Sequence, residues 1–237
     1  MNFRKQAVLS HTQQTKTIKD ADGNVYTTVQ IGNQIWTVEN WRSTKYNDGS
    51  AIPNVTDGAQ WEELTTGAYC YYDNNAANKT KYGALYNWYA VNTGKIAPDG
   101  WRVPTDADWT KLEEYLIANG YNWDGTTSEN KIAQAMAAQT DWASSMTSNG
   151  IVYSAETGTP GNDLSKNNAS GFAALPGGCR NIGGSFDGQS YIGDWWSATE
   201  DAASYAWFRF LVYGLELLLR GIHDKSCGFS LRLVRDR

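Results

Sequence analysis

The sequence predicts an α+β fold with two helices, short antiparallel strands and long irregular loops. Helix signals are confined to the middle of the chain, whereas short strand-like segments separated by glycine-containing turns dominate from residue 171 onward. This segregation of helices and strands along a chain is typical of the α+β class. The composition agrees, because 11 Trp, 14 Tyr and 23 Gly accompany only 19% charged residues. Such a composition favours long loops that are fixed by aromatic side chains.

Charge and hydropathy exclude several classes of function. The chain has 237 residues, with 20 Lys and Arg against 25 Asp and Glu, and a formal net charge of −5. An extended basic surface for nucleic acid is therefore not expected. No run of about 18 apolar residues predicts a transmembrane helix, and Met1–Asp20 lacks the apolar segment of a secretory signal peptide. Localisation stays open between a phage particle, the cytoplasm and the cell surface.

Cysteine and histidine are too sparse to indicate a metal centre or a nucleophilic triad. Cys70, Cys179 and Cys227 form no Cys-x-x-Cys pair, which a zinc site of the usual spacing would contain, and three cysteines make no disulfide framework. His11 and His223 give little basis for a histidine triad, and no P-loop or GxGxxG motif occurs. We expect no catalytic residues, no metal and no cofactor.

The N-terminal part predicts a polar arm followed by a β-hairpin. Residues 1–20 are polar and aperiodic and are expected to form a flexible arm, which leaves residues 21–237 as a single domain. Val25–Gln30 and Gln34–Val38 flank the turn dipeptide Gly32-Asn33. Two short apolar runs on either side of such a dipeptide are typical of two strands joined by a tight turn.

Two helices are expected in the middle of the chain. Thr105 is a good N-cap because Asp106 and Asp108 follow in the first turn and an apolar stripe then leads to Gly120. A second helix is expected at about Ser128–Gln139. Elsewhere the sequence predicts a short aromatic strand at Thr66–Asp73, helix-like spacing within Tyr82–Val91, and mostly loop from Thr140 to Ala169.

The segment Ala206–Gly221 has two apolar faces if it forms a β-hairpin. Alternate residues of a strand point to opposite faces, so one face carries Trp207, Arg209, Leu211 and Tyr213 and the other carries Phe208, Phe210, Val212 and Gly214. One interpretation is a strand pair buried on both sides, in which the arginines need buried partners. The other is a solvent-facing set of large apolar residues that forms a binding surface. We favour the second, because no other predicted strand pair is as apolar on both faces.

Six blocks of the sequence occur in the order known from one bacterial family: DGNVYTTVQIGNQIW, YGALYNWYA, APDGWRVPTDADW, SGFAALPGG, WWSATE and GFSLRLVRD. On these blocks the chain resembles the Fibrobacter major paralogous domain, over about residues 20–237. The fold of that family is similar to C-type lectins and formylglycine-generating enzymes, so the resemblance implies a C-type-lectin-like fold. The C-terminal third further resembles the variable proteins of diversity-generating retroelements, among them the tropism determinant of a Bordetella phage.

This resemblance implies a non-enzymatic protein whose variable region, at about residues 177–228, binds a protein or cell-surface ligand. In that family a reverse transcriptase mutates adenines in Asn codons, which cannot then yield Lys, Glu, Gln, Met or Trp. The variable ligand-binding positions carried onto this chain, none of which is one of those five types, are Cys179, Ile182, Asp187, Tyr191, Asp194, Tyr205, Phe208, Phe210, Val212, Gly214, Leu215, Leu217, Leu219, Gly221, Ile222, His223 and Cys227. Gln189 and Glu216 lie outside the reachable set and should be fixed. The scaffold positions that hold this surface are Trp195, Trp196, Glu200, Trp207, Arg209, Arg220 and Arg232.

Three alternatives remain open. An undiversified bacterial surface or carbohydrate-binding domain of the same family would share the scaffold but not the variability. An enzyme of the formylglycine-generating type needs a copper-binding cysteine pair, for which Cys179 and Cys227 are the candidates, although both are more simply weakly polar residues at displayed positions. A calcium-dependent lectin is disfavoured because the Glu-Pro-Asn, Gln-Pro-Asp and Trp-Asn-Asp motifs are absent, and Asp187, Asp194 and Asp201 are scattered acids.

Overall fold

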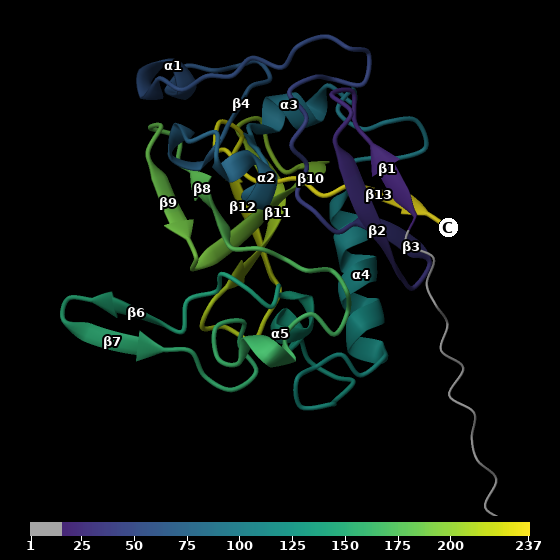
Figure 1. Cartoon of the computed structure of the whole chain (residues 1–237), viewed down its shortest axis with the longest axis vertical. Coiled ribbons are helices and arrows are strands. Elements are labelled where there is room, and N and C mark those ends of the chain that lie inside the picture. Colours follow the sequence, from purple (N-terminus) through teal and green to yellow (C-terminus); the bar gives the residue numbers. More distant parts are fainter. Residues whose placement is uncertain (1–15) are drawn as a thin grey trace, which may run out of the picture.

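Within residues 16–237 strands dominate, as the α+β class predicts, but five helices are present instead of two, and α4 alone among them is long. The computed structural model describes residues 16–237 (Figure 1). The strands are β1 (Thr17–Lys19), β2 (Val25–Ile31), β3 (Gln34–Thr37), β4 (Tyr69–Cys70), β5 (Leu85–Tyr86), β6 (Ser145–Ser148), β7 (Ile151–Ser154), β8 (Gly177–Arg180), β9 (Phe186–Gln189), β10 (Ile192–Glu200), β11 (Tyr205–Val212), β12 (Leu219–Asp224) and β13 (Val234–Asp236). The helices are α1 (Gly58–Glu62), α2 (Asn78–Tyr82), α3 (Trp88–Asn92), α4 (Asp106–Ala118) and α5 (Ala133–Met136), with short 3₁₀ turns η1 (Tyr72–Asn74) and η2 (Leu164–Lys166).

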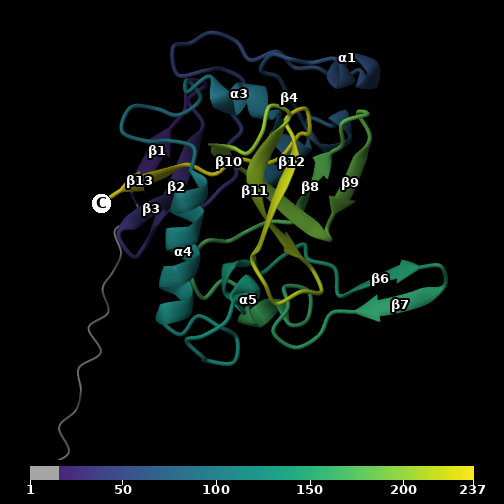
Figure 2. The same ribbon diagram turned by 180° about the vertical axis from the view of Figure 1, so that it is seen from behind.

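Two sheets organise these elements. A five-stranded sheet has the order β12-β11-β10-β8-β9, and a four-stranded sheet has the order β1-β2-β3-β13. The second sheet joins the two ends of the described chain, because β13 pairs antiparallel with β3 and places Val234 opposite Trp36. In Figure 2, β11 and β12 lie at the front of the molecule, and α4 lies beside them. The predicted hairpin of β2 and β3 is confirmed.

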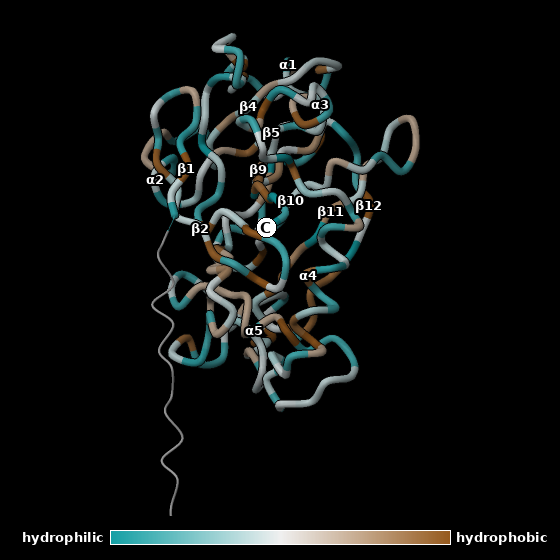
Figure 3. Tube along the Cα trace, turned by 90° about the vertical axis from the view of Figure 1, so that its right-hand side faces the viewer, coloured by the Kyte–Doolittle hydropathy of each residue, from teal (hydrophilic) through white to brown (hydrophobic). Residues whose placement is uncertain are grey.

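The five-stranded sheet has an apolar cluster on each face. Trp195 and Trp196 are adjacent in β10 and therefore point to opposite faces, and both are fully buried. Trp195 packs with the apolar stripe of α4, with α5 and with Leu211. Trp196 packs with Phe208, Phe229 and the aromatic residues of the N-terminal third. Apolar segments, brown in Figure 3, gather around α5 and beside α4.

Helix α4 begins and ends where the sequence predicts. The side chain of Thr105 accepts from the backbone N–H of Asp108, and the Asp108 carboxylate accepts from the backbone N–H of Thr105, which completes a capping box. Trp109, Leu112 and Leu116 are fully buried along one side. This helix is therefore specified by local signals as well as by packing.

Three predictions about the elements are wrong in part. The predicted arm of residues 1–20 includes strand β1, whose Ile18 is buried opposite Tyr26; the remainder of the arm, residues 1–15, lies outside the described residues. The second helix is only the single turn α5 rather than Ser128–Gln139, because the Asn130 side chain exchanges two hydrogen bonds with the backbone of Leu218. The region Thr140–Ala169, predicted to be mostly loop, contains the hairpin β6–β7.

Candidate binding face

Strand register gathers many of the predicted variable positions in one row across the five-stranded sheet. Cys179 on β8 lies opposite Asp187 on β9, and Asp194 on β10 lies opposite Phe210 on β11, which lies opposite Leu219 on β12. The parallel pairing of Gly178 with Gly193 brings Cys179 beside Asp194 one residue further along. The five side chains therefore share one face. We call this side of the sheet the candidate face.

Further residues of β11 and β12 whose side chains point to the same side of the sheet extend the candidate face along the C-terminal hairpin. Val212 lies opposite Ile192 at one end, and Gly221 lies opposite Phe208 toward the other. His223 follows on β12. On β11 itself the intervening residues Arg209 and Leu211 are fully buried on the opposite face. Burial thus alternates from Arg209 to Tyr213, whereas Trp207 is half-buried and Phe208 is buried, against the predicted pattern.

Exposure separates the predicted positions into three groups. The exposed residues are Ile182, Asp187, Tyr205, Leu215, Ile222 and His223. The half-buried residues are Cys179, Tyr191, Phe210, Val212, Gly214, Leu217, Leu219 and Gly221. The buried residues are Asp194, Phe208 and Cys227, for which the prediction of a displayed side chain is wrong.

The burial of Phe208 and Cys227 has a non-local cause. β11 is not an edge strand, and the segment after β12 returns to pair with β8 and β10, where Gly228 lies opposite Arg180 and Ser230 lies opposite Trp195. Phe208 is held between Phe229, at a ring distance of 4.9 Å, and Phe210, which stacks on it at 5.0 Å. Cys227 is fully buried in the same cluster. These residues form the base of the face rather than its surface.

Asp194 is a buried acid on the candidate face. Asp194 is only 5% exposed, and no hydrogen bond to its carboxylate is found among residues 16–237. Burial, and after it the negative charge of Asp187, raise the pKa of Asp194 to about 7. Asp194 lies in the middle of the row, with Phe210 on one side and Cys179 on the other.

Some of the predicted positions lie off the candidate face. Tyr205 and Ile222 have the parity of Trp207, which pairs with Ile222, and so point to the other side of the sheet. Gly214, Leu215 and Leu217 lie in the loop between β11 and β12. Ile182 lies in the loop between β8 and β9. The predicted set is therefore one sheet face together with its flanking loops.

One carboxylate anchors the hairpin on the side of α4. The guanidinium of Arg209, which is fully buried, donates to Asp106 Oδ1 over 2.5 Å, and Arg220 donates to Oδ2 over 3.0 Å. Burial alone would raise the pKa of Asp106, but hydrogen bonds from both arginines outweigh it and hold the pKa below its usual value. Arg220 also lies over the ring of the half-buried Trp207 at 3.4 Å. The arginines find the partner that the sequence required, although Arg220 is exposed rather than buried.

The remaining scaffold residues fix the chain around the sheet. Arg232 is fully buried and donates to Asn40 Oδ1 over 2.7 Å and to the carbonyl oxygens of Thr37 and Phe172. The indole N–H of Trp195 donates to the same Asn40 oxygen over 2.9 Å. Glu200 is exposed and forms an ion pair with the buried Lys225.

The cysteines of the candidate face are poorly suited to nucleophilic or metal chemistry. Burial, followed by nearby negative charge, raises the pKa of the Cys179 thiol well above its usual value and that of Cys227 to about 12. Cys227 Sγ lies 3.1 Å from His223 Nδ1. Within residues 16–237 no group of three or more His, Cys, Asp or Glu side chains is arranged to hold a metal ion.

Sequence reasoning missed two features of this region. The sequence predicts a role for Asp106 only in the first turn of α4, and its pairing with two arginines more than 100 residues away has no local signal. The polar character of the segment predicts loop where the hairpin β6–β7 is found, yet Ile151, Val152 and Tyr153 are apolar and exposed.

The chain is thus a sheet-rich α+β protein whose C-terminal strands carry a candidate binding face. The chain matches the model of the Fibrobacter succinogenes major domain over residues 29–235, and it belongs to that family. Searches of curated proteins and of solved structures found no match. In the described part of the chain, no helix has the length and apolar character that a membrane crossing requires.

Proposed function

We propose that this chain is a non-enzymatic binding protein that displays a hypervariable surface on a C-type-lectin-like scaffold and is diversified by a retroelement. Its ligand would be a protein or a cell-surface molecule. The observation that carries the proposal is the row from Asp187 to Leu219, in which five predicted variable positions from five strands share one face. Four of these five side chains are exposed or half-buried and can be changed at the surface, whereas Asp194 between them is buried.

The separation of display from support favours this function. Phe210 and Val212 are half-buried on the candidate face, while Arg209 and Leu211 between them are fully buried on the other. Substitution of a displayed residue therefore leaves the ion pair with Asp106 and the core around Leu211 in place. A rigid support beneath changeable side chains is also the arrangement of antibody paratopes.

Glu216 gives further support. The mutated Asn codons cannot yield Glu, so this position should not be diversified. Its carboxylate accepts the indole N–H of Trp123 over 2.5 Å, and its carbonyl oxygen accepts the backbone N–H of Ala133. A residue that ties the hairpin loop to the scaffold is expected to be fixed. The neighbouring Leu215 is exposed, as a variable position would be.

One observation favours an undiversified member of the same family instead. Asp194, Phe208 and Cys227 are buried, and free variation at such positions would destabilise the protein. The DNA around the gene distinguishes the two functions. A reverse transcriptase gene together with an imperfect repeat of the region coding for about residues 177–228 supports the proposal, and the absence of both overturns diversification.

The binding part of the proposal is tested with a displayed library. We expect that randomising Phe210, Val212, Leu219 and His223 yields folded variants that bind an arbitrary protein target such as lysozyme. A matched library randomises four exposed positions of α4: Ala107, Lys111, Glu114 and Ala118. Equal enrichment of target-binding variants from both libraries would contradict a candidate face that is specialised for binding.

A further inference from the structure

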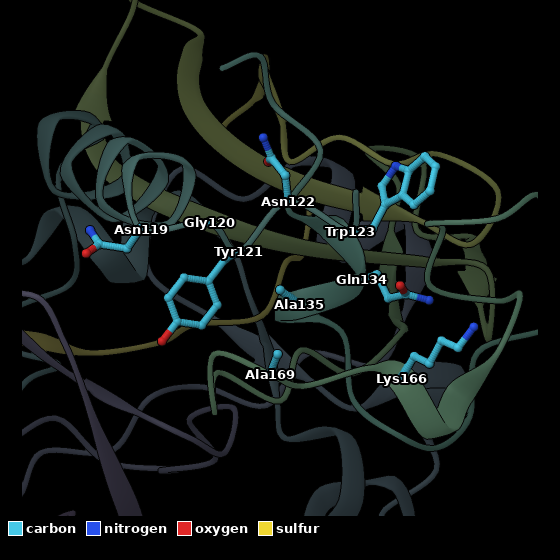
Figure 4. Close-up of a pocket in the computed structure, with 9 residues that line it drawn as sticks. All are labelled: Asn119, Gly120, Tyr121, Asn122, Trp123, Gln134, Ala135, Lys166 and Ala169. Atoms are coloured by element: carbon cyan, nitrogen blue, oxygen red, sulfur yellow. The ribbon is translucent and has the colours of Figure 1, made fainter. Parts of the chain in front are cut away.

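A hollow lies where α4 ends, next to α5 and η2, and none of the predicted variable positions lines it. Its volume is about 370 Å³, which falls within the ~300–1,000 Å³ of small-molecule sites. Figure 4 shows Trp123, Gln134 and Lys166 on one side of the view, Tyr121 and Asn119 toward the other, and the small Ala135 and Ala169 between them. The small residues leave the space that the larger ones surround.

Trp123 is a fixed aromatic wall of this pocket. Its indole N–H donates to Glu216 Oε2 over 2.5 Å. Gly158 packs against the ring so closely that an added Cβ would come within 2.3 Å of Trp123 Cδ1. The side chain is nevertheless 41% exposed. A large ring that is held in place and still open to solvent is prepared to stack on a ligand, because little rotamer entropy remains to be lost.

Gln134 supplies a side-chain amide that is free to bind a ligand in the same pocket. The residue is only 7% exposed, and no hydrogen bond to its side-chain amide is found within residues 16–237. The amide nitrogen and oxygen are not among the fully buried polar atoms without a partner, so they still reach solvent from within this nearly buried residue. Since Gln134 lines the pocket, a bound ligand with hydroxyl groups is the natural partner for both its donor and its acceptor.

The remaining lining restricts the chemistry of the ligand. Asn119 donates its Nδ2 to the carbonyl oxygen of Tyr115 over 2.8 Å, which leaves its Oδ1 as an acceptor. Lys166 is the one cationic side chain of the lining and lies 3.6 Å from Asp163. A phosphate or other strong anion is held by several charge-assisted donors, often including arginine, and this pocket lacks them. Aromatic rings combined with amide groups suit a ligand that has both apolar C–H faces and hydroxyl groups.

We propose that this pocket binds a neutral saccharide, which stacks on Trp123 and hydrogen-bonds to Gln134. The site lies outside the candidate face, although Glu216, which holds Trp123, belongs to the loop between β11 and β12. Its location on the α4 and α5 side leaves the candidate face free for a second ligand.

The test is a nuclear magnetic resonance titration of the ¹⁵N-labelled full chain with cellobiose, maltose and N,N′-diacetylchitobiose in turn. We expect at least one disaccharide to shift the indole N–H signal of Trp123, assigned with Trp123→Phe, and the side-chain amide of Gln134. Trp123→Ala should weaken binding about tenfold or more, the loss typical of a central aromatic contact. Tyr153→Ala, which removes a similarly exposed aromatic ring from β7, should leave binding unchanged.

Two outcomes would overturn the proposal: no disaccharide shifts these signals, or binding survives in a folded Trp123→Ala variant. If Trp123→Ala unfolds, Gln134→Leu replaces it as the deciding variant. This change removes only the amide and should weaken binding about fivefold, as loss of a neutral hydrogen bond does. Undiminished binding by a folded Gln134→Leu would then count against the site.

Discussion

Asp106 illustrates how much of the C-terminal hairpin depends on one side chain. It accepts hydrogen bonds from the fully buried Arg209 and from the exposed Arg220. The two arginines lie directly opposite each other on β11 and β12. A single carboxylate at the start of α4 thus bridges two like charges that would otherwise repel each other within one strand pair.

We expect Asp106→Ala to lower the free energy of unfolding by about 3–5 kcal/mol, because Arg209 remains buried without its counter-charge. Arg220→Ala removes only the exposed partner and should cost at most about 1 kcal/mol. Urea unfolding of both variants measures the difference. Equal losses in the two variants would show that burial of Arg209 is not what makes Asp106 important.

Asp194 predicts a dependence of stability on pH. Its folded pKa of about 7 lies above the unfolded value of 3.8, so the folded state binds the proton more tightly and loses stability as pH rises from about 4 to 7. Asp194→Asn should remove this loss and stabilise the protein at about pH 8 by up to about 4 kcal/mol. At about pH 4 the two proteins should unfold at similar urea concentrations. Asp201→Asn, at an exposed position whose charge does not contribute to the pKa of Asp194, is the control, and a similar gain there would argue against burial as the cause.

At the scale of elements, local signals predict what local interactions determine. The capping box of Thr105 and Asp108 fixes the start of α4, and the Gly32-Asn33 turn fixes the first hairpin, so both elements were predicted from the sequence. The second helix was predicted too long, because the bonds of Asn130 to Leu218 come from 88 residues away.

The same limit applies to the candidate face, whose local features can be predicted from the sequence and whose long-range contacts cannot. Alternation along β11 gave the correct parity for Phe210 and Val212, since it depends only on strand geometry. The burial of Phe208 and Cys227 depends on the return of the segment around Phe229, which no neighbouring residue in the sequence indicates.

The hairpin β6–β7 is expected to contribute little to the stability of the rest. It forms a two-stranded sheet of its own and projects from the body of the molecule (Figure 1), with Ile151, Val152 and Tyr153 exposed. Isolated hairpins are at best marginally stable. Replacing residues 145–154 with a short glycine-serine linker should lower the free energy of unfolding by about 1 kcal/mol, through loss of the hydrogen bond from the Tyr213 hydroxyl to the Tyr153 carbonyl oxygen. A loss above about 3 kcal/mol in urea unfolding would show that the hairpin supports the core.

At the scale of the whole molecule, residues far apart in sequence close the structure. β13 completes the sheet begun by β1, and Val234 exchanges two backbone hydrogen bonds with Arg102. Val234 is fully buried in the same cluster as Trp36, Trp109 and Trp195. The four-stranded sheet and the core on the α4 face therefore depend on the last residues of the chain.

Deleting residues 234–237 should consequently be far more damaging than the ten-residue excision of the hairpin. The deletion uncovers Trp36, removes the β3–β13 ladder and leaves the Arg102 backbone without its partner. We expect a loss of about 3 kcal/mol or more, from the buried valine and the unpaired backbone groups together. Near-ultraviolet circular dichroism, which reports on the packing of the many tryptophans, should lose its fine structure in this variant and keep it in the hairpin excision. The opposite ranking of the two deletions would mean that the core on the α4 face is closed without its last strand.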